Sequence, residues 1–162
     1  MTITGTRPFE EILVAHGAVV MRVCRALLGP TDAEDAWAET FLAALSAYPT
    51  LRPDSNVRGW LVTIAYRKSI DHLRAIARAP RPTGEVPDDV ADREIPVPDD
   101  QLWTLVASLP PKQRAAVVYR YVAGLPYAEI AALDGTSAAA ARRRAADGIA
   151  TLRQHYRGEA PS

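Results

Sequence analysis

The sequence predicts an all-α protein built from two small helical modules. Over most of the 162 residues, apolar side chains recur at spacings of three and four, which is the periodicity of amphipathic helices. No stretch shows the alternation of apolar and polar residues that a half-buried strand requires. Residues 80–100 are rich in proline and acidic residues, a composition typical of an extended linker. We therefore expect one module at residues 8–79, a flexible acidic linker at 80–100, and a second module at 101–157.

The N-terminal module is predicted to hold three helices. The first begins near Phe9 and ends at the glycine-proline pair that starts at Gly29. The second opens at Thr31 with a capping box, the sequence Thr-Asp-Ala-Glu. A loop at 48–55 contains two prolines and leads to the third helix, at 56–78. The apolar stripe of the second helix is predicted to consist of Ala33, Trp37, Phe41, Leu45 and Tyr48.

The C-terminal module is predicted to hold four helices. The first, at 102–109, ends at a pair of prolines, and the second proline can occupy the first turn of the next helix, at 112–123. The sequence Gly124-Leu-Pro breaks that helix, and two further helices follow it. The final helix is expected at 137–156.

The last two helices have the layout of a helix-turn-helix. Tyr127, Ile130 and Leu133 give the first of them an apolar side. Gly135 can adopt the positive φ that a helix C-terminus often requires, and Ser137 can cap the helix that follows. That second helix carries three consecutive arginines. In this motif the second helix enters the major groove of DNA.

Composition excludes several classes of protein. A single cysteine, Cys24, leaves no partner for an internal disulfide and is too few for a cysteine-based zinc site, so we expect it to be a small buried side chain. No uninterrupted apolar run approaches the ~20 residues that span a bilayer. The N-terminus lacks the basic flank and apolar segment of a signal peptide. These features predict a soluble cytoplasmic protein without membrane insertion.

The distribution of charge favours a nucleic-acid partner more than the net charge of zero suggests. Residues 80–100 hold 2 basic and 7 acidic side chains, whereas residues 101–162 hold 8 basic and 4 acidic ones. The acidic segment therefore masks a basic C-terminal third. Local positive charge steers association with phosphates.

Two blocks of sequence together resemble a known family. Asp32-Ala-Glu-Asp-Ala-Trp-Ala-Glu-Thr-Phe41, followed by Asn56-Val-Arg-Gly-Trp-Leu-Val-Thr-Ile-Ala65 and Ser69-Ile-Asp-His-Leu-Arg74, resembles conserved region 2 of a bacterial sigma factor. The stretch from Leu109 to Ala131, with the helix after it, resembles region 4. The size of two modules with only a linker between them is similar to the extracytoplasmic-function (ECF) group of the sigma-70 family.

The resemblance implies a specificity subunit of RNA polymerase. Such a factor binds core RNA polymerase, places region 4 on the −35 duplex of the promoter, and places region 2 on a partly single-stranded −10 element. It then helps to open the duplex. Family membership also implies an anti-sigma protein as a partner that holds the factor inactive. The resemblance implies no enzymatic activity and no cofactor.

The helix that starts near Asp32 is implied to bind polymerase. Its acidic residues are spaced for one exposed side, opposite Trp37 and Phe41. By resemblance, this side meets the clamp helices of the largest polymerase subunit, a basic coiled coil. The candidate residues for core polymerase binding are Asp32, Glu34, Asp35 and Glu39.

The third helix and the loop before it are implied to bind the −10 element. Opened bases need aromatic stacking, and cations follow the backbone. The loop at 48–55 matches the family's loop that accepts a flipped base, which needs a shaped pocket. This chain has Tyr66-Arg67 where the family usually has Arg-Asn. The candidate −10 residues are Tyr48, Trp60, Tyr66, Arg67, Lys68 and Arg74.

The recognition helix is implied to bind the −35 element. Arg142 can read guanine through O6 and N7, whereas its two arginine neighbours reach phosphates. The chain has Ala140-Ala-Arg-Arg-Arg144 where the family often has Thr-Val-Lys-Ser-Arg, so reading of the −35 element also rests on backbone contacts and DNA shape. The candidate −35 residues are Lys112, Arg114, Arg120, Ser137, Ala138, Arg142, Arg143 and Arg144.

Two alternatives remain at this stage. A free-standing helix-turn-helix regulator that does not bind polymerase would explain the C-terminal module but not the acidic block. Such regulators usually dimerise. A helical-bundle enzyme or metal protein would need facing Glu-x-x-His motifs, and no such tetrapeptide is present. His16, His72 and His155 share no metal-ligand spacing, so we assign them structural or solvent-exposed roles and expect no metal.

Overall fold

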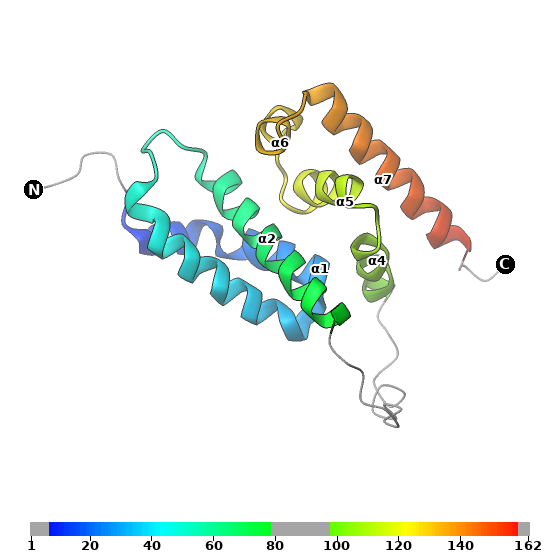
Figure 1. Cartoon of the computed structure of the whole chain (residues 1–162), viewed down its shortest axis with the longest axis horizontal. Helices are drawn as coiled ribbons and strands as arrows, with labels where there is room; N and C mark the ends of the chain where they lie inside the picture. Colours follow the sequence, from blue (N-terminus) through cyan, green and yellow to red (C-terminus); the bar gives the residue numbers. More distant parts are fainter. Residues whose placement is uncertain (1–6, 79–97, 159–162) are drawn as a thin grey trace, which may run out of the picture.

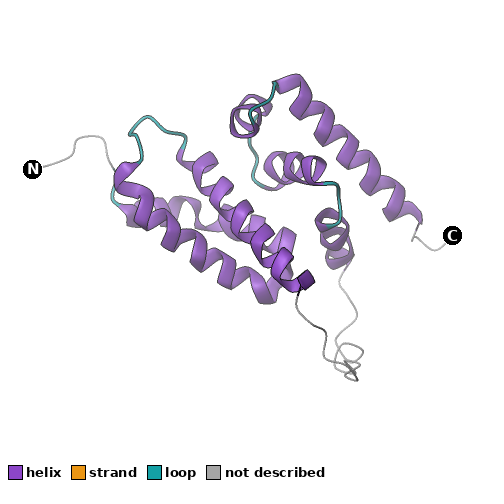
Figure 2. Cartoon of the chain, in the orientation of Figure 1, coloured by secondary structure: helices purple, strands orange, loops and turns teal. Residues whose placement is uncertain are grey.

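The computed structural model describes residues 7–78 and 98–158, and within these ranges every regular element is helical (Figures 1 and 2). This confirms the predicted all-α class. The linker predicted at 80–100 lies outside the described residues except at its end. There, helix α4 (Pro98–Ala107) begins four residues earlier than the expected start at 102, and a proline fits the first turn of a helix.

The N-terminal module consists of two long elements. Helix α1 (Phe9–Ala47) is broken at Gly29, whose φ of 78° and ψ of 174° are not helical. The break divides α1 into two arms, joined by a hydrogen bond from Trp37 Nε1 to the Gly17 carbonyl at 2.9 Å. A short 3₁₀ turn, η1 (Tyr48–Thr50), and a loop lead to α2 (Val57–Arg78). The three predicted helices are therefore the two arms of α1 and α2.

Two local details of this module differ from expectation. Within the described residues, neither Thr31 nor Glu34 makes a side-chain hydrogen bond, so the predicted capping box does not form. The break at Gly29 is sufficient to separate the arms. Leu45, expected in the core, is 52 % exposed, because Ala44, three residues after Phe41, occupies the buried position instead.

The core of the module is made of aliphatic side chains from both arms of α1 and from α2. Cys24 is buried among them, which confirms its expected role, and burial raises the pKa of its thiol. The stretch Phe9–Thr50 is long and apolar enough to cross a membrane by composition. Many of its apolar side chains pack in this core, however, and the break at Gly29 interrupts it, so the fold accounts for its apolar character.

The C-terminal module consists of α4, α5 (Pro111–Val117), α6 (Tyr127–Asp134) and α7 (Ala138–Gly158). Helix α5 continues as a wider π-helical turn, η2 (Val118–Val122), before the chain turns at Gly124. Gly135 has a φ of 67°, and the Ala140 amide donates to Ser137 Oγ at 3.1 Å. Both signals that predicted the helix-turn-helix are thereby confirmed.

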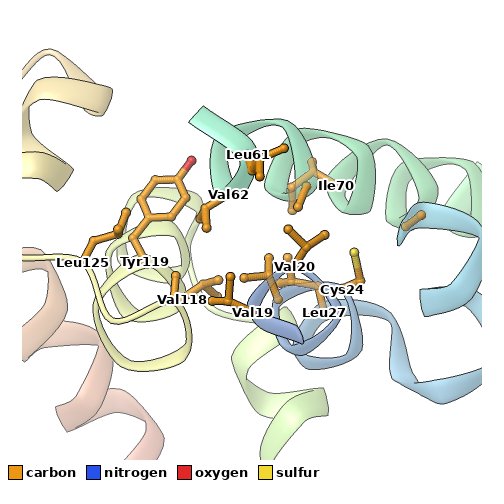
Figure 3. Close-up of a cluster of buried hydrophobic side chains, with 14 of the residues drawn as sticks. Val19, Val20, Cys24, Leu27, Leu61, Val62, Ile70, Val118, Tyr119 and Leu125 are labelled. Atoms are coloured by element: carbon orange, nitrogen blue, oxygen red, sulfur yellow. The ribbon is translucent and has the colours of Figure 1, made fainter. Parts of the chain in front are cut away.

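The two modules share one apolar core. Val118 and Tyr119 of η2, with Leu125 after it, belong to the same buried cluster as Val19 of α1 and Val62 of α2 (Figure 3). Helix α4 also contacts α1, and α6 contacts α2. The modules therefore pack directly against each other.

The close approach of α5 and α7 depends on a glycine. A Cβ added at Gly148 would lie 2.5 Å from Val117 Cγ2 and 3.3 Å from the Gln113 carbonyl oxygen. Replacing glycine by alanine inside a helix normally stabilises it by about 0.5–1 kcal/mol. At this position the overpacking should outweigh that gain.

We expect Gly148→Ala to lower the free energy of unfolding by about 1–3 kcal/mol, measured by denaturant titration. Gly17→Ala is the matched control, since its added Cβ would meet only an ordinary contact, 3.5 Å from Trp37. The control should be neutral or stabilising. Equal effects at both positions would contradict the packing argument.

Candidate polymerase-binding and nucleic-acid-binding faces

The acidic residues predicted to bind polymerase lie along the second arm of α1. Glu34, Asp35 and Glu39 are exposed, and Asp32 is half-buried. Glu39 Oε2 lies 3.0 Å from His72 Nε2 of α2, so this carboxylate is partly engaged. The face thus keeps most of its negative charge in solvent.

Two leucines extend this acidic face. Leu42 is 65 % exposed, and it follows Asp35 by seven residues, which places both on one side of the helix. Leu45 flanks the same side. Sequence reasoning missed this pair because Leu45 was assigned to the core. The signal available in the sequence was Leu42, an apolar residue outside the predicted stripe.

The loop between α1 and α2 borders a cavity of about 360 Å³. Tyr48, the only candidate −10 residue in its wall, donates a hydrogen bond from its hydroxyl to the Arg7 carbonyl. Its ring lies 5.4 Å from that of Phe9. Trp60 is half-buried and packs 6.4 Å from Tyr48, beside this wall rather than in it. The cavity is lined by Arg7, Ile12, His16, Tyr48, Leu51, Arg52, Pro53, Ser55 and Val57.

Three polar residues of this cavity were not predicted from the sequence as binding residues. Arg7, His16 and Arg52 come from separate segments, and only the fold brings them together. Burial lowers the pKa of His16, with smaller contributions from the Arg58 and Arg7 cations, so the imidazole is neutral at pH 7. Its Nδ1 is buried and has no hydrogen-bond partner among the described residues.

The remaining −10 candidates lie on α2. Arg67 and Arg74 are exposed, and Lys68 is half-buried. Tyr66 is not free: its hydroxyl accepts a hydrogen bond from Arg114 Nε at 3.1 Å, and its ring lies 5.2 Å from the Tyr119 ring. Burial raises the pKa of Tyr66, and the bond from Arg114 partly opposes that shift.

The −35 candidates divide into engaged and free side chains. Arg114 also donates to the Ala107 carbonyl at 3.0 Å. Arg120 lies with its guanidinium carbon 4.4 Å from the centre of the Tyr127 ring and donates to the Leu125 carbonyl at 3.3 Å. The guanidinium carbon of Arg142 also lies near this ring, 5.0 Å from the Tyr127 centroid.

On the recognition helix, Arg143 is exposed and makes no ion pair or hydrogen bond with a described residue. Ser137 is exposed at the start of α7, and Ala138 is half-buried. Lys112 is exposed at the start of α5. Arg144 is half-buried near Asp134, whose pKa is raised by burial and lowered less strongly by this arginine.

A second cavity, of about 270 Å³, lies between the two modules. Tyr66 and Arg74, both −10 candidates, share its wall with three −35 candidates, Lys112, Arg114 and Arg144. The structure thus brings residues predicted for two separate DNA elements to one crevice.

Comparison with family models matches both modules. Residues 12–79 match the model "Sigma-70 region 2", and residues 99–152 match "Sigma-70, region 4". The two matches follow the chain order that the motifs predicted.

Curated relatives of this chain are described as RNA polymerase sigma factors. The probable RNA polymerase sigma-C factor of Mycobacterium bovis is 33 % identical over 86 % of this chain and 78 % of its own length. The ECF RNA polymerase sigma factor SigC of Mycobacterium tuberculosis has the same identity and coverage. The RNA polymerase sigma factor CarQ of Myxococcus xanthus is 33 % identical over 90 % of this chain and 87 % of its own length.

Solved structures agree on the fold. CnrH, solved in complex with the cytosolic domain of CnrY, has a TM-score of 0.72 at 23 % identity, over 94 % of this chain and 89 % of that one. RpoE, solved with the anti-sigma factor NepR from Bartonella quintana, has a TM-score of 0.70 at 17 % identity, over 94 % of this chain and 98 % of that one. With two sigma regions in order and relatives similar over nearly the whole chain, this protein belongs to the ECF group of the sigma-70 family of RNA polymerase sigma factors.

Proposed function

We propose that this chain is a promoter-specificity subunit that acts in the cytoplasm and has no enzymatic activity of its own. Core polymerase performs the chemistry, and this chain supplies promoter recognition and strand opening. The observation that carries the proposal is the presence of both sigma regions, in order, on two helical modules. We place the functional boundaries at 8–79 for region 2 and 101–157 for region 4, with the linker at 80–100.

The acidic face of α1, with its two leucines, is the proposed docking surface for core polymerase. Exposed large apolar side chains beside charged ones are typical of interaction surfaces. Asp32, Glu34, Asp35 and Glu39 would steer a basic helical partner, while Leu42 and Leu45 would bury apolar area against it.

The cavity beside Tyr48 is the proposed receptor for a flipped −10 base. Flipping a base costs a few kcal/mol, which a shaped pocket must offset. Here Arg7 and Arg52 supply positive charge for the backbone, and Tyr48 and the neutral His16 supply stacking and hydrogen-bonding surface. The Trp60 ring packs near the Tyr48 ring, beside the cavity wall. Arg67, Lys68 and Arg74 would follow the separated strand.

Helix α7 is the proposed −35 reader. Its N-terminal turns present Ser137, Ala138 and the arginine block, in the place where the second helix of this motif meets base edges. Arg142 is held by Tyr127, which orders its guanidinium. Arg143 is free for a phosphate, and Lys112, Arg114, Arg120 and Arg144 are proposed for backbone contacts.

We also propose an anti-sigma protein as a partner. Two proteins of similar fold were solved as complexes, CnrH with the cytosolic domain of CnrY and RpoE with the anti-sigma factor NepR. Occupation of the polymerase-binding face of α1 would suffice to inhibit this chain.

The function is tested by transcription in vitro. Purified chain is added to bacterial core RNA polymerase with a library of genomic fragments, and transcript starts are sequenced. We expect starts that share −35 and −10 elements and that vanish without the chain. If the chain neither produces transcript starts nor binds core polymerase, the proposal is wrong and a free-standing helix-turn-helix regulator is favoured.

The docking surface is tested by Leu42→Asp and Leu45→Asp. Each should weaken binding to core polymerase at least about tenfold, because a buried apolar anchor is replaced by a charge that must be desolvated. Affinity is measured with labelled chain. Val14→Asp is the matched control, since Val14 is 82 % exposed on the other arm of α1. If the control is as defective as the two leucine variants, the surface is wrongly placed.

The recognition helix is tested by salt dependence of holoenzyme binding to promoter DNA. Arg143→Ala removes one proposed phosphate contact. It should reduce the slope of the logarithm of the binding constant against the logarithm of the salt concentration by about 0.9, and it should weaken binding to all promoters alike. Arg142→Ala should instead change the ranking of −35 variants.

Arg153→Ala serves as the control for both arginine variants, because this exposed residue of α7 lies about 15 Å further along the helix. Arg153→Ala should leave both the salt-dependence slope and the ranking of −35 sequence variants unchanged. An unchanged slope in Arg143→Ala would contradict the phosphate contact.

A further inference from the structure

Four positively charged side chains line the crevice between the two sigma regions. They come from three helices that are distant in the sequence, and we call them the cationic cluster: Arg74 of α2, Lys112 and Arg114 of α5, and Arg144 of α7. The cavity that they line has a volume of about 270 Å³. Asp134 adds a single carboxylate to the same wall, so four positive charges stand against one negative charge and the net charge is +3.

The cationic cluster is not neutralised within the described part of the chain. The ion pairs found among residues 7–78 and 98–158 lie elsewhere in the molecule, and none of them includes a residue of the crevice. Arg74, Lys112 and Arg144 also make no hydrogen bond with a described residue. Like charges that share a partly enclosed site repel one another, and the potential that they create attracts an anion.

Two side chains give the crevice hydrogen-bond donors in fixed positions. Arg114 is held by the bonds from its Nε to the Tyr66 hydroxyl, at 3.1 Å, and from its Nη1 to the Ala107 carbonyl, at 3.0 Å. Its Nη2 has no hydrogen-bond partner among the described residues. The Tyr66 hydroxyl accepts the bond from Arg114 and therefore keeps its own proton for a further acceptor. Burial raises the pKa of this hydroxyl, so it stays protonated at pH 7.

The chemistry and size of the crevice suit a compact anion made of phosphate groups. Guanidinium groups meet phosphate oxygens through paired N–H donors, and an ammonium group adds a point charge. The cavity is smaller than the ~300–1,000 Å³ pockets that enclose drug-sized ligands, so it cannot enclose a whole nucleotide. One phosphate group supplies at most about two negative charges, so two linked phosphate groups are needed to balance the wall.

We propose that the cationic cluster is a binding site for a pyrophosphate group, either free or as the tail of a nucleotide whose remainder stays outside the crevice. Arg114 and Tyr66 are the donors that are already in place, and the other three cations turn toward the anion. Region 2 supplies Tyr66 and Arg74, and region 4 supplies Lys112, Arg114 and Arg144, so the bound anion joins the two regions. Neither promoter recognition nor polymerase binding calls for such a ligand.

Binding is measured by isothermal titration of the full chain with inorganic pyrophosphate, without polymerase or divalent cations and in salt of about 0.15 M. We expect one site per chain. Orthophosphate should bind at least about tenfold more weakly, because a single phosphate group leaves part of the positive charge unbalanced. Absence of saturable binding, or equal affinities for the two anions, would contradict the proposal.

The placement of the site is tested with Lys112→Gln and Arg144→Gln, each of which removes one charge from the cationic cluster. Each should weaken pyrophosphate binding at least about tenfold, since a charge-assisted hydrogen bond is lost. Arg153→Gln is the matched control, because it removes the same charge from an exposed position of α7 outside the crevice. Circular dichroism reports whether each variant is folded. If the control loses as much affinity, the anion follows the charge of the whole chain and the site is wrongly placed.

Thermal unfolding gives a second measurement. An anion that binds only the folded chain raises its melting temperature as the anion concentration increases. The rise is compared with that in sulfate at the same ionic strength, because sulfate strengthens apolar burial in any protein. The wild type and Arg153→Gln should show an additional rise in pyrophosphate, and Lys112→Gln and Arg144→Gln should not. A wild type that responds equally to both anions would overturn the site.

Competition distinguishes the sources of the phosphate groups. Displacement of pyrophosphate by ATP but not by adenosine assigns the crevice to the tail of a nucleotide, and resistance to ATP assigns it to the free anion. Single-stranded DNA of about 12 nucleotides, within the site sizes common for such strands, tests the remaining source. If this DNA displaces pyrophosphate at lower phosphate concentrations than pyrophosphate itself requires, the cations belong to the DNA-binding surface and the proposal is wrong. Because these assays contain no polymerase, their outcome is independent of the transcription experiment.

Discussion

Burial of η2 against the N-terminal module is the interaction on which the arrangement of the other surfaces depends. Val118, Tyr119 and Leu125 complete a core that region 2 alone would leave open beside Val19 and Val62. Burial of apolar side chains contributes about 1.5–3 kcal/mol each relative to exposure. The two regions therefore have a preferred mutual orientation, and the polar contacts at its edge follow from it.

The polar contacts give that orientation its specificity. Apolar contact alone tolerates small sliding, whereas the Arg58 guanidinium meets the Ala123 carbonyl only in one register. Asn56 and Glu129 add a second fixed point. Separation of the regions would return these groups to water, where each finds new partners. The polar contacts therefore add little to the net cost of separating the regions, and most of that cost comes from exposing the shared apolar core.

Some candidate binding residues are exposed to solvent, and others are engaged in contacts between the two modules. Asp35 and Leu42 are exposed on the second arm of α1, and Glu39 beside them contacts His72 of α2. The candidate DNA-binding residues Tyr66, Lys112 and Arg114 lie where the regions meet. Arg143 of α7 is exposed. The residues proposed to bind polymerase and those proposed to bind DNA thus lie on different helices.

The helices, the break at Gly29, the helix-turn-helix and the two modules could all be predicted from the amino-acid sequence. Glycine, proline and helical periodicity act over a few residues, so their effects are readable locally. Which candidate residues are free of intramolecular contacts depends instead on how the helices pack. Tyr66 and Arg114 are 48 residues apart, and Arg58 and Ala123 are 65 apart. Each of these contacts depends on which helix faces pack together. The same reason explains why Leu45 points to solvent and why Arg7, His16 and Arg52 share one cavity: no local pattern records which face another module will cover.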